Sequence, residues 1–290
     1  MDKIMEKIGI IGNGFVGKAV KEGFKNYYEI FTFDKDKRKS NIETLNELVN
    51  KCKIVFLCLP TPMNKDGSCH LNIVEDTLNK INDWCDEMDY YGLEQRTIVI
   101  KSTIPPGTTK KWNKDYKYIN IAFNPEFLTE ANAIDDFKNQ NKIIIGSTRK
   151  VGSVVKNLYS KAFPKVPVIK TSATIAEMVK YFTNTFLATK VSFANEMYQI
   201  CEKLDIDYDK VVEYVKYDER IGYSHLNVPG PDGDFGFGGH CFPKDLNALI
   251  NLASKNDLGL DVNVLRAVLE TNGRVRNKRD WEDMKGRAVV

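Results

Sequence analysis

The stretch Ile8-Gly9-Ile10-Ile11-Gly12-Asn13-Gly14-Phe15-Val16-Gly17 joins an apolar run to three spaced glycines, and helical periodicity follows it. In such a strand–turn–helix unit the first glycine makes the tight turn, the second admits a pyrophosphate to the backbone, and the third allows close packing of helix and strand. The helix N-terminus then offers free N–H groups to phosphates. The alternative is a glycine-rich turn without a ligand. We predict a dinucleotide-binding turn made of Gly12, Asn13, Gly14, Phe15, Val16 and Gly17.

An acidic residue closes the next apolar run, since Asp34 stands 17 residues after Gly17. A carboxylate at that position accepts hydrogen bonds from the adenosine ribose hydroxyls and repels a 2′-phosphate, which favours NAD over NADP. The basic cluster of Lys35, Lys37, Arg38 and Lys39 is the opposing signal, because it would tolerate that phosphate. Strand, helix and acid together favour a binding site with NAD as the cofactor.

Short β-rich runs alternate with helical stretches through the first half of the chain. The runs are nearly continuous in apolar residues, as expected for strands that are buried on both faces. This alternation predicts an α/β fold with an N-terminal Rossmann doubly wound parallel sheet. The expected strands are Lys7 to Ile11, Ile30 to Phe33, Ile54 to Leu59, Thr97 to Lys101, Ile119 to Phe123 and Lys142 to Ile145, and the expected helices are Gly17 to Asn26, Ile42 to Lys51 and Asn72 to Met88.

The second half of the chain changes to helical periodicity. Residues 173–204 carry apolar side chains at helical spacing without a proline, which predicts a long helix at the spine of a domain or a dimer. Further helices are expected over Pro243 to Ser254 and Asn263 to Val275. With a boundary inside Pro164 to Ser172, we expect a Rossmann domain over 1–170, an all-helical central domain over 171–280, and the beginning of another domain over 281–290.

The segment Phe235-Gly236-Phe237-Gly238-Gly239-His240-Cys241-Phe242-Pro243-Lys244-Asp245 is the most informative part of the second half. Pro243 suits the first turn of a helix, which places Cys241 at that helix N-terminus with Lys244 nearby. Both features lower the pKa of a thiol and favour the reactive thiolate. Asp245 could orient a lysine, a water or the thiol. The alternative is a small buried cysteine in a turn, which does not explain the flanking glycines and charges.

Lys180 and Asn184 stand four residues apart on the predicted long helix and therefore share a face. An ammonium and an amide on one face can stabilise a developing oxyanion. Considered alone, these two residues are more simply interpreted as part of a solvent-exposed stripe of the helix.

Polar residues also follow three of the predicted strands, at the carboxyl edge where ligands bind in such sheets. Glu126 and Glu130 follow the fifth strand and could do acid–base work or stabilise a helix N-terminus. Thr103 and Thr61 follow the fourth and third strands and could reach a cofactor or a water, or cap helices.

Composition limits the other classes of function. A net charge of +3 on 290 residues gives no strong field for nucleic acid or anionic lipid, and the basic stretch 274–279 fits a solvated helix end. Apolar runs such as 54–60 fall far short of a membrane helix, and the charges in 1–7 argue against a signal peptide. Six scattered cysteines indicate reduced thiols in the cytoplasm, and three histidines without ligand spacing predict no metal.

Seven segments, taken in order, resemble the UDP-glucose/GDP-mannose dehydrogenase family over nearly the whole chain. They are Gly12 to Gly17, Pro60-Thr61-Pro62, Lys101 to Thr109, Asn124 to Glu130, Glu177 to Asn184, Asp218 to Gly222 and Gly236 to Asp245. The resemblance implies an NAD-dependent, four-electron oxidation of a nucleotide-sugar 6-hydroxyl to the carboxylate, with UDP-glucose as the first choice of substrate. It also implies a homodimer through the long helix and a role in supplying polysaccharide precursors.

The resemblance further implies a role for individual residues. Cys241 would attack the intermediate aldehyde and carry the thioester, and Lys180 and Asn184 would steady the oxyanion. Asp245, Thr103, Glu126 and Glu130 would handle water and protons. Besides the glycine turn, the cofactor would contact Asp34, Lys39, Pro60, Thr61, Thr103, Glu130 and Lys244, and the substrate would contact Phe127, Leu128, Lys180, Asn184, Arg220, Phe235, Gly236, Gly238 and Cys241, with Arg220 reaching across the dimer.

Two departures from the family pattern leave alternatives open. Members usually carry a third, C-terminal Rossmann-like domain that holds much of the nucleotide, whereas Met284 to Val290 resembles only its first strand. The chain is then a shortened piece, a natural short form, or one half of a two-chain enzyme. His240 stands where serine is common and resembles members acting on N-acetylated amino sugars. The alternatives are therefore GDP-mannose or a UDP-N-acetylhexosamine as substrate, a β-hydroxyacid dehydrogenase, or an NAD-binding chain that is inactive without a partner.

Overall fold

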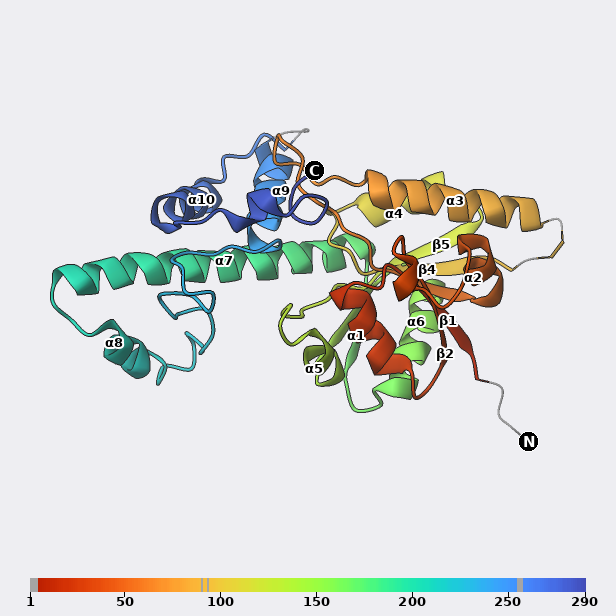
Figure 1. Ribbon diagram of the computed structural model, residues 1–290, viewed down its shortest axis with the longest axis horizontal. Coiled ribbons are helices and arrows are strands. Elements are labelled where there is room, and N and C mark those ends of the chain that lie inside the picture. Colours follow the sequence, from red (N-terminus) through yellow and green to blue (C-terminus); the bar gives the residue numbers. More distant parts are fainter. Residues whose placement is uncertain (1–4, 90, 93, 255–257) are drawn as a thin grey trace. The chain divides into compact units, whose positions relative to one another are not determined.

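The computed structural model describes residues 5–89, 91–92, 94–254 and 258–290 (Figure 1). The chain separates into two compact units. Unit 1 contains the residues up to Thr61 together with Leu71–Lys180, and unit 2 contains Pro62–His70 and Tyr181–Val290. The chain therefore passes between the units three times, and each unit is described by itself below.

Unit 1 is built on a seven-stranded sheet in the order β2-β1-β3-β4-β5-β6-β7. Every neighbouring pair is parallel except β5 and β6, which pair antiparallel at Phe123 and Gly146. The six predicted strands are confirmed, with ends that shift by at most two residues. The strands are β1 (Lys7–Ile11), β2 (Glu29–Phe33), β3 (Ile54–Leu57), β4 (Arg96–Ile100), β5 (Ile119–Phe123), β6 (Ile143–Gly146) and β7 (Val168–Thr171).

Helices cover both faces of this sheet, which confirms the predicted doubly wound architecture (Figure 1). One buried cluster joins the sheet to α2, α3 and α4 through residues such as Leu48, Leu78 and Trp112. The other joins it to α1, α5 and α6 through an aromatic group around Phe24 and Tyr159. The helices are α1 (Phe15–Phe24), α2 (Leu45–Lys51), α3 (Asn72–Asp89), α4 (Thr108–Asp115), α5 (Ala133–Lys138) and α6 (Arg149–Ala162), with a short 3-10 turn η1 (Lys37–Lys39).

A 31-residue helix, α7 (Ala173–Lys203), is the predicted spine, and it ends within one residue of the expected range. Its first eight residues belong to unit 1 and the rest to unit 2. Unit 2 adds α8 (Tyr208–Val215), α9 (Phe242–Ser254), α10 (Asn263–Val275) and the short η2 (Asp280–Asp283). Two small clusters pack α8, α9 and α10 against α7, one centred on Tyr208 and one on Leu246. The predicted helical second domain is therefore confirmed.

The structure contains several elements that the sequence did not predict. The stretch 164–172, expected as a boundary, contains β7, which pairs with β6 along its whole length. This strand is short and partly exposed, so it lacks the apolar run that marks a buried strand. Helices α4, α5, α6 and α8 were not predicted either. Near the end of the chain, Val289 forms isolated bridges with Met63 and Lys285.

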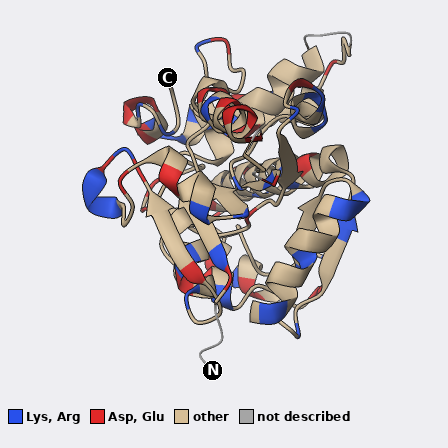
Figure 2. Ribbon diagram, turned by 90° about the vertical axis from the view of Figure 1, so that its right-hand side faces the viewer, with Lys and Arg blue, Asp and Glu red and all other residues tan. Residues whose placement is uncertain are grey.

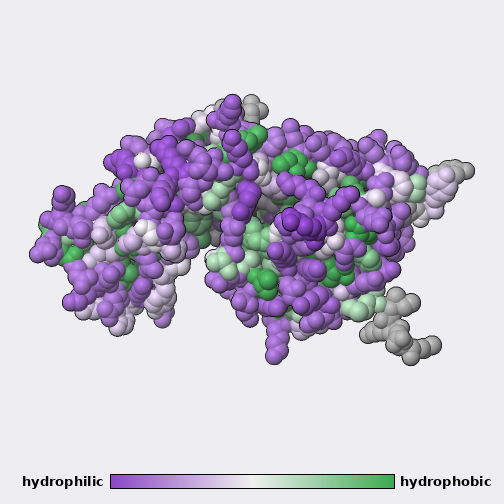
Figure 3. All heavy atoms as spheres, viewed as in Figure 1, coloured by the Kyte–Doolittle hydropathy of each residue, from purple (hydrophilic) through white to green (hydrophobic). Residues whose placement is uncertain are grey.

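Neither charged nor apolar residues gather into one large patch in the views shown. Basic and acidic residues are interspersed in Figure 2, in keeping with the small net charge. Hydrophilic side chains cover most of the face seen in Figure 3. Within the ranges given above, no helix is long and apolar enough to cross a membrane, and no group of three or more His, Cys, Asp and Glu side chains could hold a metal ion.

Candidate active site

The glycine turn of unit 1 leads from β1 directly into α1, whose N-cap is Gly14. Gly12 has a φ of +88°, and a Cβ there would lie 2.4 Å from the carbonyl oxygen of Cys58. A Cβ at Gly17 would lie 2.0 Å from the carbonyl oxygen of Gly12. A Cβ at Gly14 would meet no described atom within 4 Å, so the space above the helix N-terminus is open. Gly12 and Gly17 are therefore required by close contacts with neighbouring backbone, whereas Gly14 leaves room for a ligand.

Asp34 shapes this turn from the end of β2. Its Oδ2 accepts a hydrogen bond from the backbone N of Asn13 at 2.7 Å, and its Oδ1 accepts one from the N of Asp36 at 2.9 Å. The Asn13 amide donates through Nδ2 to the carbonyl oxygen of Lys39 at 2.7 Å. Asn13 Oδ1 is buried and has no hydrogen-bond partner in the described parts of the chain. The turn thus holds one orphaned acceptor beside the open helix N-terminus, which fits a ligand with hydroxyl donors.

Glu126 and Lys180 form a buried ion pair in unit 1. Lys180 Nζ donates to Glu126 Oε1 at 3.0 Å and to the Glu126 carbonyl oxygen at 2.7 Å. The two side chains are 8% and 5% exposed, which contradicts the solvated-stripe interpretation of Lys180. Glu126 Oε2 accepts from the N of Leu128 at 2.7 Å. Burial alone would raise the pKa of Glu126, but the Lys180 ammonium and the Leu128 N–H hold it below its usual value.

Lys101 belongs to the same region, although the sequence alone gave it no role. Its ammonium donates to Asn124 Oδ1 at 3.0 Å and to the carbonyl oxygen of Pro125 at 3.2 Å. Tyr159 Oη donates to the same Asn124 oxygen at 2.5 Å. Burial lowers the pKa of Lys101 to about 8. The Lys101 and Glu126 side chains line a pocket of about 350 Å³ at this edge, together with Phe127, Leu128, Thr129 and Lys142.

The remaining candidates of unit 1 lie at the same carboxyl edge of the sheet. Thr61 Oγ1 donates to the carbonyl oxygen of Thr103 at 2.8 Å, so the segments after β3 and β4 are joined directly. Both threonines are buried, whereas Pro60 is half-buried and Glu130 is exposed. Glu126 and Glu130 do not cap α5, whose N-cap is Asn132. Phe127 lies beneath two cations, with its ring centroid 4.9 Å from Lys142 Nζ and 5.6 Å from Lys180 Nζ.

Glu177 is a buried carboxylate to which the sequence analysis assigned no role. It lies one turn before Lys180 on α7 and is fully buried. Its carboxylate accepts the backbone N–H groups of Gly107 at 2.6 Å and Thr109 at 2.8 Å, at the N-terminus of α4. Burial raises the pKa of Glu177, and the two N–H donors oppose that shift. The helix that carries Lys180 is thereby tied to the segment after Thr103.

Cys241 in unit 2 is half-buried and immediately precedes α9, with Pro243 in the first turn as the sequence predicts. Asp245, 1% exposed, accepts from Lys244 Nζ at 2.5 Å and from Asn184 Nδ2 at 2.6 Å. Burial opposes the charge of Lys244, but the Asp245 carboxylate, together with Cys241 and Cys69 in their thiolate forms, raises its pKa. A buried hydrogen-bonded series therefore runs from Asn184 on α7 through Asp245 to the ammonium of Lys244, three residues after Cys241.

The last sequence-derived candidates lie in the loops before α9. Phe235 is half-buried against Tyr198, and Gly236 is buried with a φ of +67°. Gly238 lies against the guanidinium of Arg276, described below. Arg220 has an 89% exposed side chain and pairs with Asp218 at 2.5 Å. Within unit 2, the Arg220 side chain is therefore largely in solvent.

Comparison with other proteins shows which sequences this chain is similar to. UDP-glucose 6-dehydrogenase TuaD of Bacillus subtilis (strain 168) is 33% identical over 310 residues, covering 94% of this chain and 64% of the relative. A UDP-glucose 6-dehydrogenase of Rickettsia felis is 34% identical over 234 residues, covering 78% of this chain and 49% of the relative. The chain therefore spans between about half and two thirds of the length of these relatives.

A solved structure supports the same fold. The UDP-glucose dehydrogenase of the hyperthermophilic archaeon Pyrobaculum islandicum superposes with a TM-score of 0.83 at 29% identity, covering 94% of this chain and 69% of that one. This likeness confirms the predicted fold class, a Rossmann sheet followed by a helical domain.

Two domain families match the sequence in order. Residues 35–163 match the NAD binding domain of the UDP-glucose/GDP-mannose dehydrogenase family, which confirms NAD as the cofactor indicated by the sequence. Residues 174–274 match the central domain of the same family. On these two matches, the chain belongs to the UDP-glucose/GDP-mannose dehydrogenase family.

Proposed function

We propose that this chain oxidises the 6-hydroxyl of a nucleotide sugar to the carboxylate in two NAD-dependent steps, with UDP-glucose as the substrate and UDP-glucuronate as the product. The observation that carries the proposal is the half-buried Cys241 at the start of α9, next to the buried series of Lys244, Asp245 and Asn184. A thiol beside an ammonium and a helix N-terminus is suited to attack an aldehyde. A simple alcohol dehydrogenase has no use for such a thiol.

The glycine turn supports NAD binding through its open helix N-terminus at Gly14 and the orphaned acceptor on Asn13. Asp34, with Lys39, would hold the adenosine ribose, and Gly12 to Gly17 would receive the pyrophosphate. We assign contacts with the rest of the cofactor to Pro60, Thr61, Thr103, Glu130 and Lys244. When bound, NAD supplies a hydride acceptor for each oxidation.

The first oxidation converts the C6 alcohol to an aldehyde by removal of a hydride and a proton. The thiolate of Cys241 then adds to C6 and forms a C–S bond, leaving the former carbonyl oxygen as an oxyanion. We assign Lys180 and Asn184 to stabilise that oxyanion, because each is a buried donor. Removal of a second hydride from C6 gives the thioester on Cys241.

Hydrolysis completes the reaction. A water held by Asp245 and Thr103 would attack the thioester carbon, and Glu126 and Glu130 would take up its protons. The C–S bond breaks, the carboxylate leaves, and the Cys241 thiolate is regenerated. We assign contacts with the sugar nucleotide to Phe127, Leu128, Phe235, Gly236 and Gly238.

We further propose that the protein is a homodimer through α7, with Arg220 reaching the substrate of the other subunit. Large apolar side chains at helical spacing are exposed on α7, among them Phe182 at 67%, Phe186 at 55% and Phe193 at 59%. Such a stripe is typical of a subunit interface. Because the six cysteines lack the spacing of a disulfide framework, we also propose the cytoplasm as its compartment.

The test is product analysis. The protein is incubated with NAD and, in turn, UDP-glucose, GDP-mannose, UDP-N-acetylglucosamine and UDP-N-acetylmannosamine, and the sugar acids are identified by mass spectrometry. UDP-glucuronate from UDP-glucose alone supports the proposal, whereas a uronate from another sugar corrects the substrate. Binding of NAD without any acid, and without calorimetric heat from UDP-glucose, would favour an NAD-binding chain that needs a partner.

A further inference from the structure

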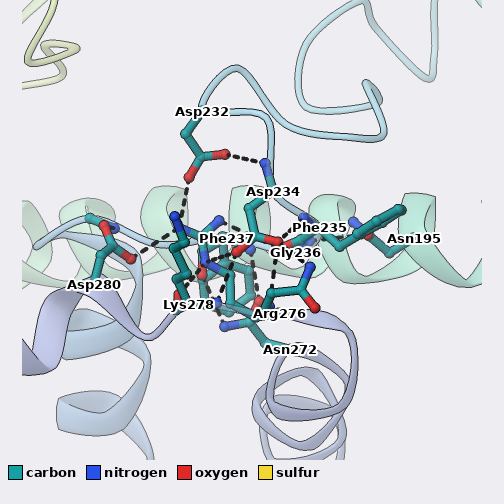
Figure 4. A network of polar contacts seen from close by, with 12 residues as sticks. Asn195, Asp232, Asp234, Phe235, Gly236, Phe237, Asn272, Arg276, Lys278 and Asp280 are labelled. Atoms are coloured by element: carbon teal, nitrogen blue, oxygen red, sulfur yellow. Dashed lines mark hydrogen bonds and ion pairs between the residues drawn. The ribbon is translucent and has the colours of Figure 1, made fainter.

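Side chains from three other elements hold the backbone of the loop before Cys241, all within unit 2 (Figure 4). Asn195 comes from α7, Asn272 from α10 and Asp280 from η2. Each accepts one backbone N–H of the loop through a side-chain oxygen. The three bonds are Gly236 N to Asn195 Oδ1 at 3.0 Å, Phe237 N to Asn272 Oδ1 at 2.7 Å, and Gly239 N to Asp280 Oδ2 at 2.9 Å.

Asn272 forms two hydrogen bonds with the backbone of the loop. Besides accepting from Phe237 N, it donates through Nδ2 to the carbonyl oxygen of Phe237 at 3.0 Å. Asn272 is 1% exposed, so neither bond competes with water. Because one amide satisfies both polar groups of a single residue, substitution by an apolar side chain leaves a buried donor and a buried acceptor unpaired.

Arg276 is the second fixed point, with a side chain that is only 3% exposed. Its Nη2 lies 3.0 Å from Asp280 Oδ1 and 2.6 Å from Asp232 Oδ2, and its Nε donates to the carbonyl oxygen of Lys278 at 2.8 Å. Burial opposes its charge, but the two carboxylates raise the pKa of Arg276. The guanidinium therefore holds Asp280 in place, and Asp280 in turn holds Gly239.

The glycines of the loop match these side chains. A Cβ at Gly236 would lie 2.2 Å from Asn272 Oδ1, and one at Gly238 would lie 2.1 Å from Arg276 Nη2. The glycine spacing is thus required by Asn272 and Arg276, apart from any approach of a substrate. Only His240 separates the last held residue, Gly239, from Cys241, and α9 begins on the other side of the thiol.

We propose that Asn272 and the Arg276–Asp280 pair are positioning residues for Cys241, which hold its thiol beside Lys244 and the N-terminus of α9. The importance of this position for the reaction rests on the function proposed above. The position of the thiol does not depend on that function, because it can be measured in the absence of any substrate.

The experiment compares Asn272→Ala and Arg276→Met with Arg274→Met as the matched control. Arg274 lies two residues before Arg276, but it is 64% exposed and pairs with Glu196 outside the loop. The rate of iodoacetamide alkylation at Cys241 is measured against pH by mass spectrometry of its peptide, and thermal unfolding monitors the fold. We expect the apparent pKa of the thiol to rise by about one unit in the two test variants, because the thiol leaves the ammonium and the helix N-terminus. The control should keep the wild-type profile.

Two conservative variants cover the case in which the first pair does not fold. Asn272→Gln keeps both the donor and the acceptor of the amide on a longer side chain, and Arg276→Lys keeps the charge but not the fork. Both should give smaller shifts in the same direction. A wild-type alkylation profile in folded variants would overturn the positioning role. If the alkylation profile shifts in the test variants but the wild-type chain forms no sugar acid, only the proposed function is contradicted.

Discussion

Lys180 Nζ lies 3.0 Å from Glu126 Oε1, and the two side chains are 5% and 8% exposed. The pair connects the segment after β5 to the long helix α7 within unit 1. Lys180 Nζ also donates to the Glu126 carbonyl oxygen at 2.7 Å, so two hydrogen bonds hold the ammonium in one position. A lysine held in this way at a buried helix face is a preorganised cation, which is the property that oxyanion stabilisation requires.

Removal of the cation should destabilise the fold strongly. Lys180→Met leaves the Glu126 carboxylate buried without its partner, and the expected loss in the free energy of unfolding is about 3–5 kcal/mol. The measurement is urea denaturation followed by circular dichroism. The double variant Lys180→Met/Glu126→Gln should recover part of the loss. Lys203→Met, at an exposed position in the last turn of the same helix, should change little. Equal losses for Lys180→Met and Lys203→Met would contradict this account.

Lys101 should make stability depend on alkaline pH. Its pKa in the folded chain is about 8, below the usual value of 10.5, so the unfolded chain binds more protons between these values. Stability from this group is therefore lowest below about pH 8 and rises as pH increases toward about 10.5. Across that window the free-energy difference between wild type and Lys101→Met should change by about 3 kcal/mol in favour of wild type. Urea denaturation at several pH values measures this, and parallel curves would refute it.

The glycine turn should separate folding from cofactor binding. Gly14→Ala places a methyl group in open space, so the fold should survive while NAD binding weakens by roughly tenfold or more, since the pyrophosphate needs that space. Gly12→Ala meets the Cys58 carbonyl at 2.4 Å with φ at +88°, so it should lower the melting temperature. Thermal unfolding and NAD titration by calorimetry measure both. Unchanged NAD affinity in Gly14→Ala would exclude this turn as the pyrophosphate site.

Asp34 should set the choice between NAD and NADP. Asp34→Asn keeps an oxygen for the Asn13 N–H but removes the charge that repels a 2′-phosphate. With the basic residues Lys35, Lys37, Arg38 and Lys39 nearby, the preference for NAD should fall by about tenfold. The ratio of the dissociation constants for the two cofactors is the measurement. An unchanged ratio would mean that the carboxylate shapes the turn but does not read the ribose.

The sequence was sufficient for the elements that carry a strong periodic signal. The buried strands β1 and β5 and the helix α10 were predicted with their observed ends, because apolar periodicity is a local property. The strand β7 was missed because its side chains are half exposed and mixed in character. Pattern alone could not find it, since its stability comes from pairing with β6.

The same limit applies to the site. Spacing placed Cys241 before a helix and Lys180 one turn from Asn184, and the structure agrees on both. The partners of these residues are distant in sequence and were not predicted: Glu126 lies 54 residues from Lys180, and Asn184 lies 61 residues from Asp245. Glu177 and Asn272 look like ordinary helix residues until the backbone groups that they bind are known.

We propose that the chain carries out a four-electron oxidation through Cys241. The most direct test is the amount of NADH formed per UDP-glucose consumed, followed by absorbance, in wild type and in Cys241→Ala. We expect two NADH for each sugar in wild type, and loss of the second oxidation and of UDP-glucuronate in the variant. Full turnover in Cys241→Ala, or a single NADH for each sugar in wild type, would contradict it and would indicate a two-electron dehydrogenase.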